Sequence, residues 1–223
     1  MDFKLEWFTA TAPSPNSADS HTVSHPSVEL TVPGEFKILS GGAIDNYTGY
    51  GNILTASYPA KADGDLALDH VPRKWIAAGK DHQVSDPSSI TAWVIALYDP
   101  DDVWDVQFFQ GTPDSGKHAL TAWAWFPIGG YVLTGGGANV TYTGAGNLLT
   151  ASFPSDDPSH QGAWEARAKD HDVEDLSESL TAYIIGIRSR DGILRLTPVV
   201  GPPVNGAVAE HPFVLAPFRS TRG

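Results

Sequence analysis

One stretch of this chain occurs twice, and the repeat constrains the fold more than any other feature of the sequence. Residues 41–59 read GGAIDNYTGYGNILTASYP, and residues 136–154 read GGANVTYTGAGNLLTASFP. Thirteen of these nineteen positions are identical at a constant offset of 95. A chain of this kind is expected to form one structural unit twice.

The repeat continues downstream with a change of offset. Residues 75–82, WIAAGKDH, match residues 164–171, WEARAKDH, and residues 89–97, SITAWVIAL, match residues 179–187, SLTAYIIGI. The loops before the first of these blocks differ in length. Fifteen residues separate Pro59 from Trp75, whereas nine separate Pro154 from Trp164.

These matches divide the chain into three parts. We define unit 1 as residues 1–98 and unit 2 as residues 103–191. The remainder, residues 192–223, loosely resembles the beginning of a unit, and we expect it to pack on the others as closing strands that leave no sheet edge exposed.

The residue pattern predicts an all-β protein made of two tandem, pseudo-symmetric units, in a sandwich, prism or barrel form. Short alternating runs are separated by turn residues, among 22 Gly and 17 Pro, and helical periodicity is absent. Residues 90–97 and 180–187 are apolar on both faces, which predicts two central strands that are each covered on both sides.

Composition argues against several classes of function. A net charge of −12 disfavours nucleic acid and anionic membranes as partners. No run approaches the roughly 18 apolar residues of a membrane span, so no membrane insertion is expected. The N-terminal residues lack a signal-peptide pattern, which favours a cytoplasmic or non-classically exported chain. The glycine runs lack the dinucleotide and Walker fingerprints, and we expect no cofactor.

The duplicated Lys-Asp-His triplets are the main candidates for chemistry. Strand alternation turns Asp81 and Asp170 inward, where a carboxylate typically accepts backbone N–H groups near a turn. The lysines and histidines then face outward and are the better ligand-binding candidates: Lys80, His82, Lys169 and His171. If the protein is an enzyme, the acid and base groups expected to meet where the units join are Asp81, His82, Asp170 and His171.

The repeated Tyr-Thr-Gly-Xaa-Gly-Asn segment is a second candidate for binding. Its tyrosines, Tyr47 and Tyr142, and its asparagines, Asn52 and Asn147, could contact a ligand, although a glycine-rich hairpin turn explains the same residues.

The unequal loops are acidic, and their weak candidates for a cation are Asp63, Asp65, Asp156 and Asp157. They show no EF-hand or HExxH spacing, so solvated loops explain them better.

Tryptophan is abundant, with seven residues. Trp75 and Trp164 share a face with small residues, which favours core packing. Four others, Trp7, Trp104, Trp123 and Trp125, lie in less strictly repeated strands, where an exposed ring can stack on a sugar.

The leading hypothesis is therefore a non-catalytic, lectin-like protein that binds a glycan or another small polar ligand, with one equivalent site per unit. An enzyme of hydrolase or lyase type is the first alternative. A structural subunit of a toxin, capsid or appendage is the second, and a homo-oligomer is compatible with all three.

Overall fold

The computed structural model describes residues 4–13, 24–49, 51–64, 70–81, 84–143, 148–170, 176 and 178–192. Their regular structure is β-strand throughout, apart from one short 3-10 helix, η1 (Pro158–His160). The predicted all-β class is confirmed. Within these residues, no helix is long and apolar enough to span a membrane. The segment after residue 192 lies outside the described residues.

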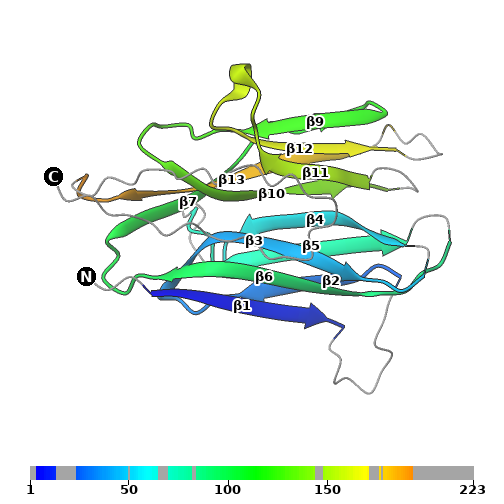
Figure 1. The fold of residues 1–223 in the computed structure, drawn as a ribbon, viewed down its shortest axis with the longest axis horizontal. Coiled ribbons are helices and arrows are strands. Elements are labelled where there is room, and N and C mark those ends of the chain that lie inside the picture. Colours follow the sequence, from blue (N-terminus) through cyan, green and yellow to red (C-terminus); the bar gives the residue numbers. More distant parts are fainter. Residues whose placement is uncertain are drawn as a thin grey trace, which may run out of the picture.

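The strands form three antiparallel sheets (Figure 1). The first has the order β1 (Lys4–Ala12), β6 (Ser89–Tyr98), β3 (Phe36–Asn46). The second has the order β2 (Ser27–Thr31), β5 (Lys74–Asp81), β4 (Asn52–Ala60), β10 (Val132–Thr141), β13 (Ser179–Ser189), β7 (Trp104–Gln110), with β8 (Asp114–Ser115) also paired to β13. The third has the order β11 (Leu148–Pro154), β12 (Trp164–Lys169), β9 (Ala119–Ala124).

The repeated segments use the same strand pairings. Gly42 of β3 lies opposite Trp93 of β6, and the matching Gly137 of β10 lies opposite Tyr183 of β13. Pairing of β4 with β5 corresponds in the same way to pairing of β11 with β12, and both ladders have an irregularity one residue after a leucine. The segments from the two units are then joined, because β4 pairs with β10 in a single sheet.

The repeated Gly-Gly-Ala motif makes room for a tryptophan. A Cβ atom on Gly41 would lie 2.7 Å from the ring of Trp75, and one on Gly136 would collide with the ring of Trp164. Each indole N–H also donates to a serine of the repeat, from Trp75 to Ser57 at 3.1 Å and from Trp164 to Ser152 at 2.8 Å. The repeated Gly-Gly-Ala motif therefore has a structural role, because its glycine allows an indole ring to lie against the sheet.

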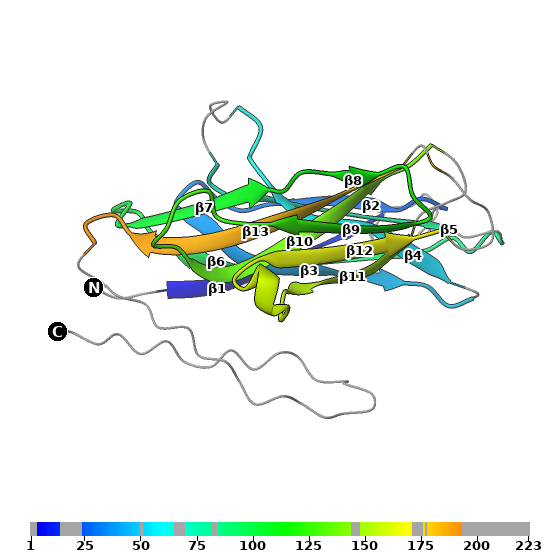
Figure 2. The ribbon, with the colours of Figure 1, turned by 90° about the horizontal axis from the view of Figure 1, so that it is seen from above.

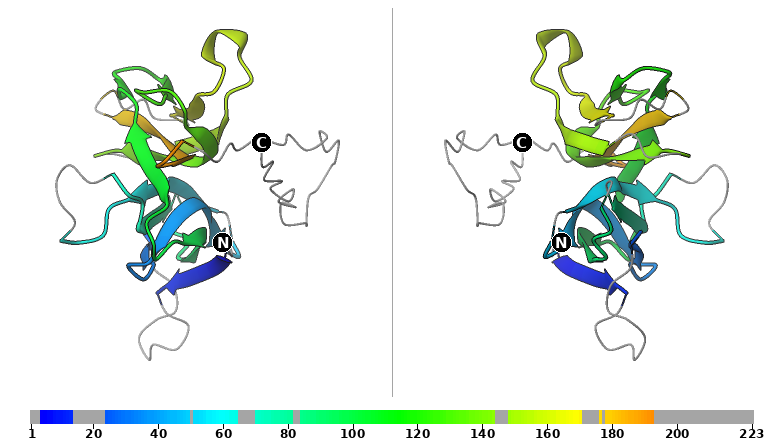
Figure 3. Two further views of the ribbon diagram at one scale, coloured as in Figure 1. Left: turned by 90° about the vertical axis from the view of Figure 1, so that its left-hand side faces the viewer. Right: turned by 90° about the vertical axis from the view of Figure 1, so that its right-hand side faces the viewer.

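Two apolar clusters lie between the sheets. One contains the inward residues of β2, β3, β5 and β6, and it extends to Ile185 and Ile187 of β13. The other lies among β9, β10, β12 and β13 and contains Ile184. In Figure 3 the blue and cyan strands occupy the lower half of the molecule and the yellow and orange strands the upper half.

Strand β13 is buried on both faces, as predicted, because Ile184 and Ile185 belong to different clusters. The same prediction is wrong for β6. Its inward residues are buried, whereas Thr91, Trp93 and Ile95 on the opposite face are only half-buried. The reason is its position in an outer sheet, which has no described layer beyond it (Figure 1).

Candidate functional site

A groove follows the edge of β9 that does not pair with β12. The chain leaving β7 passes close to this edge, and a Cβ atom on Gly111 would collide with the carbonyl of Trp123. Glycine is therefore required where the two segments approach. The groove is an open depression with a volume of about 360 Å³. It is lined by Thr112, Pro113, Asp114, Lys117, Ala119, Thr121, Ala122, Trp123 and Trp125.

Two indoles form the apolar wall of this cavity. Alternation along β9 buries Ala122 and Ala124 and turns Trp123 outward, and Trp125 follows on the same side with 46% of its surface exposed. The two ring centroids are 6.4 Å apart. The indole nitrogen of Trp123 is buried and has no hydrogen-bond partner among the described residues.

The short loop before β12 supports this wall. His160, in η1, stacks on Trp123 with a centroid distance of 4.5 Å and an interplanar angle of 8°. Asp157 holds the loop, because its carboxylate accepts from the backbone N–H of Ser159 at 2.8 Å and lies 3.3 Å from the imidazole. Figure 2 shows η1 beside β12. The imidazole thus fixes the plane of an indole that lines the cavity.

The polar wall is an ion pair. The carboxylate of Asp114 accepts from Lys117 Nζ at 2.6 Å, from the backbone N–H of Ser115 at 3.1 Å and from that of Thr121 at 3.0 Å. Burial alone would raise the pKa of Asp114, but these hydrogen bonds outweigh burial and lower it. The carboxylate is therefore ionised at neutral pH, beside an ammonium group.

Lys80 is buried rather than exposed, which corrects its expected outward position. Lys80 is 2% exposed, and its ammonium lies 4.0 Å from the ring centroid of Tyr142, another predicted ligand residue. Glu165 is also buried and pairs with Arg167. The lysine that matches Lys80 in the repeat, Lys169, is exposed. Equal sequence positions therefore have unequal surroundings.

The other predicted ligand residues are separated. Asn52 is buried, and its amide donates to the carboxylate of Asp81 at 3.0 Å, whereas Tyr47 is 51% exposed. Asp170 is fully buried and lies 3.2 Å from the imidazole of His118. Asp81 and Asp170 thus have different partners at the ends of strands in different sheets.

The acidic loops have other contacts. Asp63 forms an ion pair with Lys74 at 2.8 Å, Asp156 is exposed, and Asp157 holds the loop around η1. Across the described ranges, no three His, Asp or Glu side chains are grouped so that they could hold a metal ion. Four predicted site residues lie outside the described residues: His82, His171, Asn147 and Asp65.

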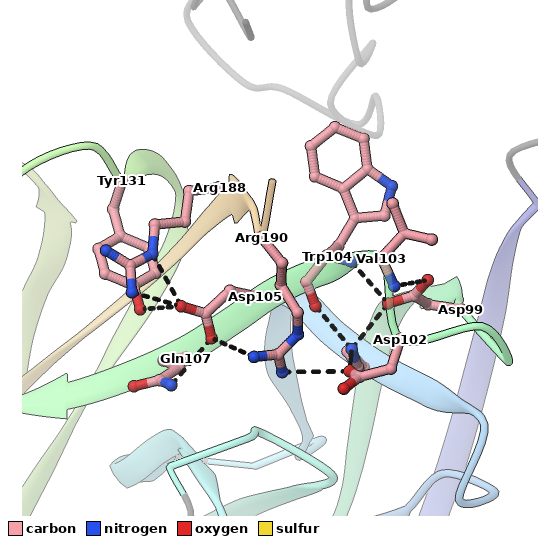
Figure 4. Close-up of polar contacts among 10 residues, drawn as sticks. Asp99, Asp102, Val103, Trp104, Asp105, Gln107, Tyr131, Arg188 and Arg190 are labelled. Atoms are coloured by element: carbon pink, nitrogen blue, oxygen red, sulfur yellow. Dashed lines mark hydrogen bonds and ion pairs between the residues drawn. The ribbon is translucent and has the colours of Figure 1, made fainter. Parts of the chain in front are cut away.

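A second polar cluster joins the ends of several strands (Figure 4). The buried ammonium of Lys37 donates to Asp99 at 2.7 Å and to the carbonyl of Trp104 at 2.6 Å. Nearby, Asp105 accepts from Tyr131 at 2.6 Å and from Arg188 at 2.8 Å.

The protonation states in this cluster favour a structural role. Burial alone would raise the pKa of Asp105, but the hydrogen bonds from Tyr131 and Arg188 hold it below its ordinary value. Burial and the contact with Asp105 raise the pKa of Tyr131, so this phenol stays protonated. A carboxylate that remains charged and a phenol that remains neutral stabilise the fold rather than exchange protons.

Sequence reasoning identified Trp123 and Trp125 as candidates for exposure but missed Asp114 and Lys117. The available signal was the segment Thr-Pro-Asp-Ser-Gly, which indicates a turn and places a carboxylate where it can accept backbone N–H groups. No family model matches the chain, and no curated protein matches it either.

Proposed function

We propose that the protein is a non-catalytic carbohydrate-binding protein whose site is the groove beside β9. The observation that carries the proposal is that two indoles and a compact ion pair line the same open groove. Aromatic rings provide apolar contact for the C–H face of a pyranose, and a few fixed polar groups orient its hydroxyls.

The proposal places one site in unit 2 and none at the matching place in unit 1. Glu29 of β2 pairs with Ile76, and Trp123 of β9 pairs with Glu165, the residue that matches Ile76. Glu29 therefore occupies the place of Trp123. This differs from the expectation of one equivalent site per unit.

We also propose that the two units are related by pseudo-symmetry. The matched register of the repeated glycines and the repeated tryptophan–serine hydrogen bonds support this relation. The differences between the units, including the groove, then arise from substitutions and from unequal loop lengths within the same arrangement of strands.

Glycan-array binding followed by calorimetry with a soluble hit tests the function. Replacement of Trp125 by Ala should weaken binding about tenfold, because a sugar loses one stacking surface. Trp7→Ala is the matched control, since Trp7 is exposed on β1, outside the groove. Absence of any glycan ligand for the wild type, or equal loss in both variants, would contradict the proposal.

One observation favours an enzyme as the second candidate. Fully buried Asp170 contacts the imidazole of His118, which is 56% exposed at its side chain, and a buried carboxylate can orient a histidine for proton transfer. A screen with chromogenic glycosides and esters should then show activity that is lost in His118→Ala. Wild-type activity at the level of that variant would remove this candidate.

A further inference from the structure

The charged groups of the β9 groove cancel one another. Asp114 and Lys117 are the charged residues that line the cavity, and their carboxylate and ammonium groups lie 2.6 Å apart. A free lysine in an aromatic pocket would attract an anionic ligand, but this ammonium is already neutralised. The groove therefore presents both signs of charge and no net charge.

The remaining hydrogen-bonding capacity suits hydroxyl groups. Asp114 Oδ1 accepts two hydrogen bonds and Oδ2 accepts one, which leaves acceptor capacity on Oδ2. The ammonium of Lys117 has three N–H donors and uses one on Asp114. Thr112 and Thr121 add hydroxyl groups to the lining. A sugar hydroxyl can both donate to the carboxylate and accept from the ammonium. A ligand carboxylate ordinarily ionised at neutral pH can only accept, and repulsion from Asp114 offsets its attraction to Lys117, so its lost hydration is not compensated.

We propose that the groove selects neutral pyranose sugars over their acidic counterparts, and that Asp114 is the residue that determines this selectivity. The inference rests on the proposed carbohydrate-binding function. The cavity is at the small end of the range for ligand pockets, which suits a terminal sugar rather than a long chain. The net charge of −12 acts in the same direction, because it repels anionic glycans over longer distances.

Paired ligands that differ only at C6 test the selectivity. Calorimetry or ligand-observed NMR is used with methyl glucopyranoside against methyl glucuronide, and with methyl galactopyranoside against methyl galacturonide. At least one neutral sugar should bind roughly tenfold more tightly than its uronide, a ratio expected for one unfavourable charge contact near a protein surface. Equal or tighter binding of the uronides would overturn the inference and leave the proposed function standing.

Charge variants identify the residue responsible. Asp114→Asn keeps a side-chain acceptor for one backbone N–H group but leaves the charge of Lys117 unpaired. The preference for the neutral sugar over its uronide should therefore shrink at least threefold or reverse. Adding Lys117→Met to that variant should remove the uronide binding gained. An unchanged ratio in Asp114→Asn would overturn the role of Asp114.

One control variant and one overall outcome complete the experiment. Lys117→Met alone leaves the carboxylate uncompensated, so discrimination against the uronide should persist or increase, and this variant serves if Asp114→Asn fails to fold. A loss of discrimination in Lys117→Met would count against the inference. Failure of all four sugars and of the glycan array to bind would contradict the proposed function itself, which separates the two failures.

Discussion

Strands β6 and β13 have matching sequences, and each pairs with a strand that carries the repeated Gly-Gly-Ala motif, yet of the two only β13 is buried on both faces. Ile185 of β13 is fully buried, whereas Ile95, at the corresponding position of β6, is half-buried. Strand β13 lies between two apolar clusters, and β6 belongs to an outer sheet. The two matching strands thus share one pairing register, while the position of each strand among the layers decides its burial.

The largest effect is expected from a substitution at the repeated glycine, which tests whether this glycine makes room for a tryptophan in both units. Gly136→Val should destabilise the fold by at least roughly 3 kcal/mol, because the new side chain would collide with Trp164 and with the carbonyl of Tyr183. Gly41→Val should have a similarly large effect through Trp75. Chemical denaturation measures both.

The control for these variants is Gly34→Ala, because a Cβ atom there meets nothing within 4 Å. Its unfolding free energy should stay within about 0.5 kcal/mol of the wild type. If Gly136→Val were equally neutral, the proposed reason for the repeated motif would be wrong.

Matched isoleucine deletions examine the difference between the strands directly. Ile185→Ala should cost roughly 3–4 kcal/mol, since it empties a fully buried site, and Ile95→Ala about 1 kcal/mol. Urea denaturation of the two variants measures this gap. Equal losses would show that β6 is covered in solution by something beyond the described residues.

The ends of the two strands also differ, because Arg188 stands where β6 has Tyr98. Asp105→Asn, which removes the negative charge that faces Arg188, should cost roughly 2–4 kcal/mol at pH 7. The lowered pKa of Asp105 means that its contribution is present above the unfolded-state pKa near 4 and is lost as pH falls through the folded-state value.

Stability of the wild type and Asp105→Asn is therefore compared between pH 7 and pH 2. Their difference should shrink below about pH 4 as the wild-type carboxylate becomes protonated. A difference that stays constant to pH 2 would mean that charge on Asp105 is not what stabilises the cluster.

The smallest expected effect is on the exposed face of the outer sheet. Trp7 stacks on Trp93 at 4.9 Å but is 56% exposed, so Trp7→Ser should change stability by about 1 kcal/mol or less. Thermal melts measure this, and light scattering of the same samples reports association. A concentration-dependent loss of stability in the variant would indicate that this face is an interface between copies.

The sequence predicts the local features of this fold well, because alternation and turn residues act over short distances. It identified the strand segments, the inward Trp75 and the buried Asp170. It did not predict that Lys80 would be buried, because Tyr142 comes from the other unit and only the joined sheet brings them together.

The candidate site also depends on contacts between segments that are far apart in the sequence. The exposure of Trp125 is compatible with a less strictly repeated strand, but the cavity depends on how the chain after Gly111 passes the edge of β9. That approach is non-local. Asp114 and Lys117 are close in sequence, but nothing in their turn motif shows that two indoles line the same groove.

The extension of one apolar cluster across both units bears on cooperativity and on synthesis at the ribosome. Ile185 and Ile187 complete a cluster formed mainly by unit 1 and are among the last residues of unit 2 to be synthesised. Unit 1 therefore lacks part of its interior until the chain has been synthesised through residue 187. We expect the described body to melt in a single transition, and a chain that stops after Tyr98 to remain without a stable fold.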